Sequence, residues 1–178
     1  MNQLRKTYFS GKATGWLRVF AVLLFFSFTG EALKPEAQRK QAPDFTLVDA
    51  KNQAVTLSAY KGRVVLLDFW ATWCGGCKTE IPWYMEFDKK YREHGLAVIG
   101  VAMDDEGMKV VGPFIKQKGI DYTIVMGNDV LAKKYNLTGM PLTLLIDRSG
   151  RIAVSHAGVV NRDAFDSAIQ QLLGLGAH

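Results

Sequence analysis

The sequence predicts an α/β domain in which a central mixed β-sheet is flanked by helices on both faces. Two nearly continuous apolar runs, at residues 64–71 and 96–102, are typical of strands that are buried on both sides. Helical patterns follow both runs, and two further strand-like runs precede a final helix. The chain has 178 residues, of which 48% are hydrophobic, and this is enough for one domain with an ample core.

The first half of the domain is expected to start with an N-terminal β-hairpin. The predicted elements are a strand at 45–48, a strand at 55–57, a buried strand at 64–71, and a helix from the cysteine pair to about His94. A polar loop separates the first two strands. Ser58 is placed to cap a short turn that leads into the buried strand, and a glycine after His94 ends the helix.

The second half continues the alternation of strands and helices. The predicted elements are a strand at 96–102, a helix at 106–118, a strand at 122–126, a helix from Asn128 or Asp129 to Tyr135, strands at 142–147 and 152–156, and a helix at 162–173. The last two strands flank Arg148-Ser149-Gly150, which is typical of a hairpin turn. No internal repeat interrupts this order.

The first thirty residues differ from the rest of the chain. They contain four basic residues and no acidic one, followed by an apolar stretch of about ten residues that ends at Phe28. This pattern is typical of a secretory signal peptide. An uncleaved N-terminal membrane anchor is an alternative because the cleavage signal is weak, and an amphipathic helix of the domain is a third. We expect an extracytoplasmic protein, in the periplasm or cell envelope, secreted or anchored by this segment.

The boundaries that follow are a signal peptide or anchor at 1–30, a linker at 31–42 and a single domain at 43–178. The linker is predicted from low apolar content. The formal net charge is +5, and the four basic residues of the first thirty supply +4 of it, which leaves about +1 for the exported part. This charge is too small for a nucleic-acid-binding surface, so nucleic acid is excluded as a partner.

The only two cysteines, Cys74 and Cys77, lie where the buried strand gives way to the helix. Unpaired N–H groups at a helix N-terminus favour a thiolate, so a reactive dithiol is predicted. A zinc site is the first alternative, but His94, His156 and His178 do not have zinc-ligand spacing. A structural disulfide would close a very short loop and contribute little stability. Two inert buried cysteines are the remaining alternative.

Two segments carry a resemblance to a known family. Residues 68–82 (DFWATWCGGCKTEIP) and 139–143 (GMPLT) resemble the thioredoxin superfamily, and within it the TlpA/ResA-like extracytoplasmic thiol-disulfide oxidoreductases. The opening at 42–47 (APDFTL) and an inserted helix and strand at about 107–126 are similar to that branch rather than to plain thioredoxin. The resemblance covers residues 42–174 and implies a thioredoxin-like fold.

The resemblance also implies roles for the site residues. Cys74, nearer the helix N-terminus, is expected to attack a substrate disulfide, and Cys77 to resolve the mixed disulfide, with the reversed order as the alternative. The Met140–Pro141 bond is expected to be cis and to face the dithiol, so that the backbone of Met140 can pair with an extended substrate. An ordinary trans proline is the alternative. Trp73 is expected to form an apolar platform for the partner.

Two acidic residues are candidates for proton transfer. Asp68 matches the buried aspartate of thioredoxin, and a carboxyl buried without a partner should have a raised pKa, which suits proton exchange with Cys77. A hydrogen-bonded or edge carboxylate is the alternative. Glu80 matches an acidic residue of the ResA-like branch, and an acid that only complements the helix dipole is its alternative. The sequence leaves open which acid serves Cys77. His94 and His156 are expected to have no catalytic role.

The expected function is reduction of protein disulfides through the Cys74–Cys77 pair, with no cofactor other than that redox-active disulfide. The resemblance implies apocytochrome c as a substrate class, in cytochrome c maturation, and a membrane thiol as the electron donor. Gly76 stands where thioredoxin has proline, so the redox potential cannot be transferred from relatives. The alternatives are a peroxiredoxin-like peroxidase and a non-enzymatic copper-binding chaperone module.

Overall fold

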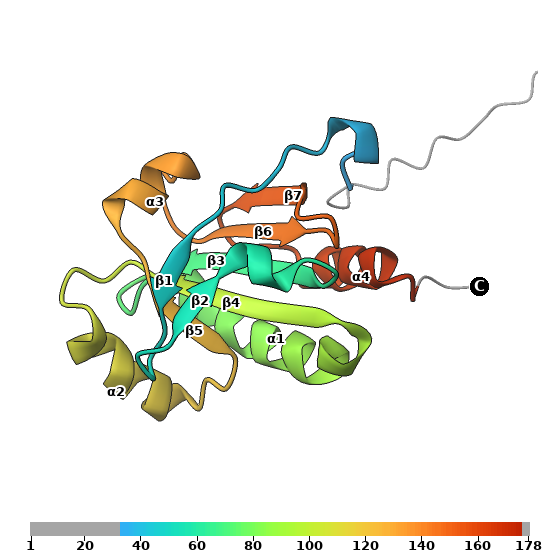
Figure 1. Cartoon of the computed structure of the whole chain (residues 1–178). Helices are drawn as coiled ribbons and strands as arrows, with labels where there is room; N and C mark the ends of the chain where they lie inside the picture. The colour runs from blue at the N-terminus through green and yellow to red at the C-terminus, as the bar shows by residue number, and fades with distance from the viewer. Residues whose placement is uncertain (1–32, 176–178) are drawn as a thin grey trace, which may run out of the picture.

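The predicted mixed sheet is present, with five strands in the order β5-β4-β3-β6-β7 (Figure 1). The computed structural model describes residues 33–175, so the signal peptide or anchor predicted at 1–30 lies outside the described residues. The strands are β3 (Val64–Trp70), β4 (Leu96–Ala102), β5 (Thr123–Met126), β6 (Leu142–Ile146) and β7 (Ile152–Ala157). The first three run parallel to one another, whereas β6 and β7 pair in antiparallel directions.

The N-terminal hairpin is also confirmed, as a separate two-stranded sheet of β1 (Thr46–Val48) and β2 (Ala54–Thr56). The side chain of Asp49 accepts hydrogen bonds from the N–H groups of Lys51 and Gln53, which closes the turn between the two strands. Asp49 also forms a bridge to Val125, and this bridge fixes the hairpin to the edge strand of the main sheet.

The helices follow the predicted positions closely. They are α1 (Gly75–Tyr91), α2 (Met108–Lys118), α3 (Asp129–Lys134) and α4 (Arg162–Leu173), with short 3-10 turns η1 (Glu36–Gln38), η2 (Leu57–Tyr60) and η3 (Arg92–His94). The side chain of Asn128 caps α3, as one of the two predicted caps. Gly95 adopts a left-handed conformation after η3, which explains why the predicted helix ends there.

Successive side chains of the fully buried strand β3 point to opposite faces of the sheet, and each face packs against its own hydrophobic cluster. Leu66 and Trp70 face a cluster formed with α1, α2 and α4, whereas Leu67 and Phe69 face a cluster formed with the hairpin, η2 and α3. Figure 1 shows the sheet between these two layers. Asp68 has the same parity as Leu66 and Trp70, so its carboxylate lies on the α1 side of the sheet.

The described part of the predicted linker differs from the expectation. The N–H of Lys34 bonds to the carbonyl of Ala153, and the N–H of Ile152 bonds to the carbonyl of Lys40, so this segment lies against β7. Gln41 forms a bridge to Arg151. These contacts are mostly backbone hydrogen bonds to an edge strand, and such bonds require no apolar side chains. Composition therefore gave no signal for the docking of residues 33–42.

Candidate functional site: a disulfide beside two buried acids

Cys74 and Cys77 form a disulfide at the N-terminus of α1, with an S–S distance of 1.97 Å. Cys74 is the N-cap residue, and its sulfur accepts a hydrogen bond from the N–H of Cys77 at 3.2 Å. Cys74 retains 5% of its accessible surface, whereas Cys77 has none. Of the two cysteines, Cys74 is therefore the one that a partner can approach.

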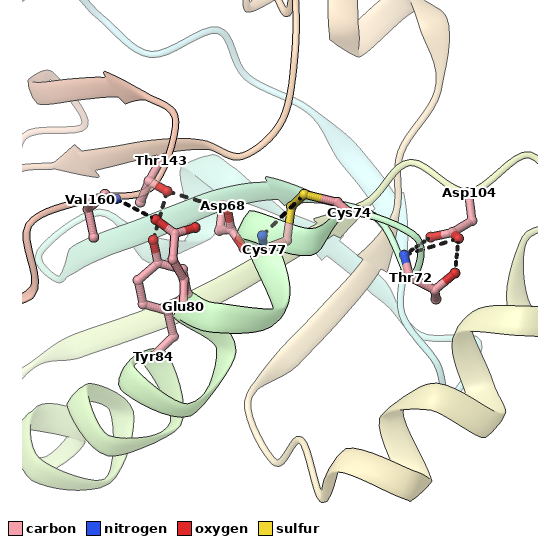
Figure 2. Close-up of a disulfide and its surroundings, with 9 residues drawn as sticks. All are labelled: Asp68, Thr72, Cys74, Cys77, Glu80, Tyr84, Asp104, Thr143 and Val160. Carbon is pink, nitrogen blue, oxygen red and sulfur yellow. Dashed lines mark hydrogen bonds between the residues drawn. A yellow bond between two sulfur atoms is a disulfide. The ribbon is translucent and has the colours of Figure 1, made fainter.

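The turn before the disulfide is held by an acid that the sequence did not single out. The carboxylate of Asp104, which follows β4, accepts hydrogen bonds from the N–H and the hydroxyl of Thr72 (Figure 2). Because β3 and β4 are parallel neighbours, the residues after them meet at the same edge of the sheet. No spacing pattern in the sequence links Thr72 to Asp104, and only the strand order reveals the pair.

The loop before β6 meets the dithiol turn directly. The Met140–Pro141 bond is cis, as the resemblance implied. A Cβ atom added to Gly76 would lie 3.2 Å from Cδ of Pro141 and 2.9 Å from Cγ2 of Val159. Gly76 therefore allows two loops to approach the turn that carries the disulfide more closely than a larger residue would.

The surface beside Cys74 is apolar and open. Trp73 is 65% exposed and Val159 is 45% exposed, and both are large side chains that most domains would bury in part. Met140 is half-buried and packs against the α1-side cluster. Pro141 is buried, and the partner contacts of Trp73, Met140 and Pro141 stay a prediction.

Asp68 lies beneath this surface with no accessible area. Its Oδ1 accepts a hydrogen bond of 3.4 Å from the hydroxyl of Thr143, and its Oδ2 has no partner within the described residues. Burial raises the pKa of Asp68 well above its usual range, the negative charge of Glu80 raises it further, and the Thr143 hydrogen bond offsets only part of this.

Glu80 is buried on the same side, one helical turn beyond Cys77. Its Oε1 accepts a hydrogen bond of 2.7 Å from the N–H of Val160, whereas Oε2 has no hydrogen-bond partner within residues 33–175. Burial raises the pKa of Glu80, and the Val160 N–H, the Tyr84 hydroxyl and the charge of His156 act against that rise.

Two buried hydroxyl groups connect the acids. Tyr84 and Thr143 lie 2.8 Å apart at their oxygens, and Thr143 also contacts Asp68. In Figure 2 the two carboxylates and the two hydroxyls form one polar cluster next to the Cys77 turn of α1. The structure thus brings together both acids that the sequence proposed. It adds Tyr84 and Thr143, of which only Thr143 belongs to a segment singled out beforehand.

His156 also belongs to this neighbourhood, although its strand position suggested no role. It lies opposite Thr143 in the β6–β7 ladder and interacts electrostatically with Glu80. His94 lies at the other end of α1 from the cysteines. Among residues 33–175 no group of three or more His, Cys, Asp and Glu side chains is arranged to hold a metal ion. His178, named above only as a histidine without zinc-ligand spacing, lies outside the described residues.

Comparisons with known proteins agree with this chemistry. The sequence model of the AhpC/TSA family matches residues 39–155. The thiol-disulfide oxidoreductase ResA of Geobacillus kaustophilus is 30% identical over 132 residues, which are 74% of this chain and 75% of that protein. The thioredoxin-like protein YneN of Bacillus subtilis is 28% identical over 164 residues, covering 86% and 96% of the two chains.

Among solved structures, the chain is similar to a thiol:disulfide interchange protein of the thioredoxin family from Chlorobium tepidum. The TM-score is 0.71 and the sequence identity is 28%, and the match covers 79% of this chain and 100% of the Chlorobium tepidum chain.

Proposed function

The chain belongs to the AhpC/TSA family and is a thiol-disulfide oxidoreductase of the ResA type, and we propose that it reduces protein disulfides outside the cytoplasm. Its fold is the thioredoxin-like fold that the sequence predicted. The observation that carries the proposal is the disulfide at the N-terminus of α1, in which Cys74 keeps some accessible surface and Cys77 is fully buried, next to the polar cluster that holds the buried Asp68 and Glu80.

The reaction begins from the reduced dithiol. The thiolate of Cys74 attacks one sulfur of the substrate disulfide, a Cys74–substrate disulfide forms, and the first substrate sulfur leaves as a thiolate that takes up a proton. Cys77 then attacks the sulfur of Cys74. The Cys74–Cys77 disulfide forms, the second substrate thiolate leaves, and two electrons have passed from the protein to the substrate. The residual exposure of Cys74 supports this order of attack.

The buried acids serve the second step. Cys77 has no accessible surface, so its thiol cannot give its proton directly to bulk water. The pKa of Asp68 and the pKa of Glu80 are both raised by burial, so both carboxyl groups hold a proton more readily than an exposed acid does, as a group that accepts the Cys77 proton must. Their unpartnered oxygens leave room for that proton. We therefore assign both acids, rather than one of them, to proton transfer at Cys77.

The same two acids also favour reduction of the substrate disulfide over its formation. Strongly oxidising dithiols owe their potential to a stabilised thiolate in the reduced protein. Negative charge on Asp68 or Glu80 disfavours a thiolate at Cys77, so the reduced state gains less and gives up its electrons more readily. A redox potential in the reducing part of the range that dithiol proteins span is therefore expected.

The proposal also covers the location of the protein, its electron donor and its substrate class. The basic and apolar pattern of residues 1–30 supports export or anchoring, with a membrane thiol as the donor that reduces the disulfide again. Within residues 33–175, none of the helices combines the length and apolar character needed to cross a bilayer. The haem-attachment cysteines of apocytochrome c are the proposed substrate class, and the exposed apolar side chains of Trp73 and Val159, beside the half-buried Met140, suit an extended peptide.

Trapping tests the function. A Cys77→Ala variant should accumulate a mixed disulfide between Cys74 and a disulfide-containing peptide from an apocytochrome c, identified by mass spectrometry, whereas Cys74→Ala should accumulate none. Trapping by Cys74→Ala alone would reverse the assigned order. Wild-type protein should also reduce insulin disulfides. If it instead consumes hydrogen peroxide at the expense of the dithiol, or binds copper one-to-one without reducing insulin, the corresponding alternative function replaces the proposal.

A further inference from the structure

His156 lies on the same side of the sheet as the buried acids. It is the direct partner of Thr143 in the antiparallel β6–β7 ladder, and side chains directly opposite each other in such a ladder lie on the same face. The hydroxyl of Thr143 contacts the carboxylate of Asp68 on that face. The register of two strands therefore places an imidazole next to the acid cluster, which its isolated position in the sequence did not indicate.

The surroundings of His156 hold it between this cluster and solvent. Nε2 lies 3.2 Å from the carbonyl oxygen of Val159, and the ring meets Phe165 edge-on with 6.2 Å between centroids. The following residue, Val160, donates its N–H to Glu80. The imidazole and the carboxylate of Glu80 are thus attached to the same short segment, and they interact electrostatically.

His156 is more exposed to solvent than the acid cluster that it borders. Asp68, Glu80, Thr143 and Tyr84 have no accessible surface at all. His156 is half-exposed. A proton that leaves Cys77 for either carboxyl group must still reach water before the next cycle, and an imidazole can take up and release a proton in the physiological pH range.

We propose that His156 is a positioning residue that acts through Glu80 and provides the route by which protons pass between the buried Asp68–Glu80 pair and solvent. When Cys77 is oxidised, its proton moves to a carboxyl group of the pair, then through Glu80 to the imidazole and to water. When the disulfide is reduced again, a proton follows the reverse route. Only protons move in these steps. This inference rests on the proposed function for its direction.

The other groups around His156 fit this role. Glu80 interacts with it from α1, and Thr143 lies opposite it on β6, where the Thr143 hydroxyl contacts Tyr84 of α1 and Asp68 of β3. Phe165 faces it from α4. Arg162, in the first turn of α4, directs its guanidinium toward Glu86 and Asp163 instead. Within residues 33–175, the described interaction that couples His156 to the buried acids is the one with Glu80.

The test uses the full chain with His156→Ala, and His94→Ala as a matched control at the far end of α1. The reduced protein is mixed with oxidised glutathione, and its oxidation is followed by tryptophan fluorescence between pH 5 and pH 9. We expect His156→Ala to oxidise roughly tenfold more slowly near neutral pH, with a changed pH profile. Added imidazole should restore the rate. The control should match the wild type.

A normal pH profile in His156→Ala, or a slow rate that imidazole does not restore, would overturn the inference. Measured in the Cys77→Ala background, attack by Cys74 should be unaffected by the histidine change, and an equal slowing there would also overturn it. Failure of the proposed function is distinguishable, because the wild type would then not reduce insulin although its oxidation by glutathione could still show the effect of His156.

Discussion

Among residues 33–175, the buried acids Asp147 and Asp104 differ in hydrogen bonding from the buried acids Asp68 and Glu80. Asp147 accepts bonds from the N–H and hydroxyl of Ser149, from the N–H of Arg151 and from the guanidinium of Arg39. Asp104 accepts three bonds from Thr72. At the disulfide, Asp68 accepts a hydrogen bond from Thr143 and Glu80 accepts one from the N–H of Val160, and each acid keeps one buried oxygen without a hydrogen-bond partner within the described residues.

This difference separates acids that hold the fold from acids placed for chemistry. A buried polar atom without a partner costs about 1–3 kcal/mol, so two such carboxylates in one cluster reduce stability. At Asp147, burial would raise the pKa, but the hydrogen bonds from Ser149, Arg151 and Arg39 outweigh it and the pKa is lowered. At Asp68 burial prevails and the pKa is raised. Folding therefore weakens proton binding at Asp147 and strengthens proton binding at Asp68.

The largest effect on stability is expected at Asp147. Replacing it with alanine leaves four donors without their acceptor, including a guanidinium whose side chain is only 14% exposed. The free energy of unfolding, measured with urea, should fall by about 3 kcal/mol. Asp163→Ala is the control, since that carboxylate is 90% exposed, and it should leave the unfolding curve unchanged. If the free energy of unfolding falls no further in Asp147→Ala than in Asp163→Ala, Asp147 does not hold the fold and its contrast with Asp68 and Glu80 is wrong.

Opposite pH dependences are expected next. The folded protein binds a proton at Asp68 more tightly than the unfolded chain does, so the wild type loses stability as pH rises above about 4, by about 1.4 kcal/mol per unit of raised pKa. Asp68→Asn lacks this loss and should gain in melting temperature relative to wild type from pH 4 to pH 8.

Asp147 should behave in the reverse way. Its lowered pKa contributes stability that is present above about pH 4 and is lost as pH falls through the folded pKa. The deficit of Asp147→Asn relative to wild type should therefore shrink toward pH 2. Calorimetric melting of both variants across pH 2–8 measures the two slopes, and slopes of the same sign would refute the distinction between the acids.

A smaller effect is expected at the turn before the disulfide. Thr72→Val removes one donor from the buried carboxylate of Asp104 while keeping the shape of the side chain. The expected loss is about 1–2 kcal/mol in the free energy of unfolding. Thr79→Val on the exposed side of α1 is the matched control. Equal unfolding curves for the two variants would show that Asp104 is not a structural acid of the kind that Asp147 represents.

Much of this architecture was accessible from the sequence because it depends on local patterns. The apolar runs of β3 and β4, the cap at Asn128 and the glycine after η3 each specify an element within a few residues. The disulfide, Asp68 and Glu80 were found because they lie within one continuous segment of the chain, close to the end of β3 and the start of α1.

The rest depends on strand order, which no local pattern specifies. Asp104 meets Thr72 because β3 and β4 are neighbours, and His156 meets the acids because β7 pairs with β6 in a given register. The docking of residues 33–42 on β7 uses backbone groups, which every sequence possesses. Tyr84 was placed on α1 by its helical spacing, but its contact with Thr143 required the folded structure.

Single-turnover kinetics test the central claim, that the poorly hydrogen-bonded acids supply protons whereas the well-bonded acids hold the fold. Reduced wild type, Asp68→Asn, Glu80→Gln and Asp147→Asn are mixed with a disulfide peptide, and loss of the mixed disulfide is followed by acid quench and mass spectrometry. The account predicts resolution about 100-fold slower in the first two variants and unchanged in folded Asp147→Asn. Equal resolution rates in all four proteins would contradict it.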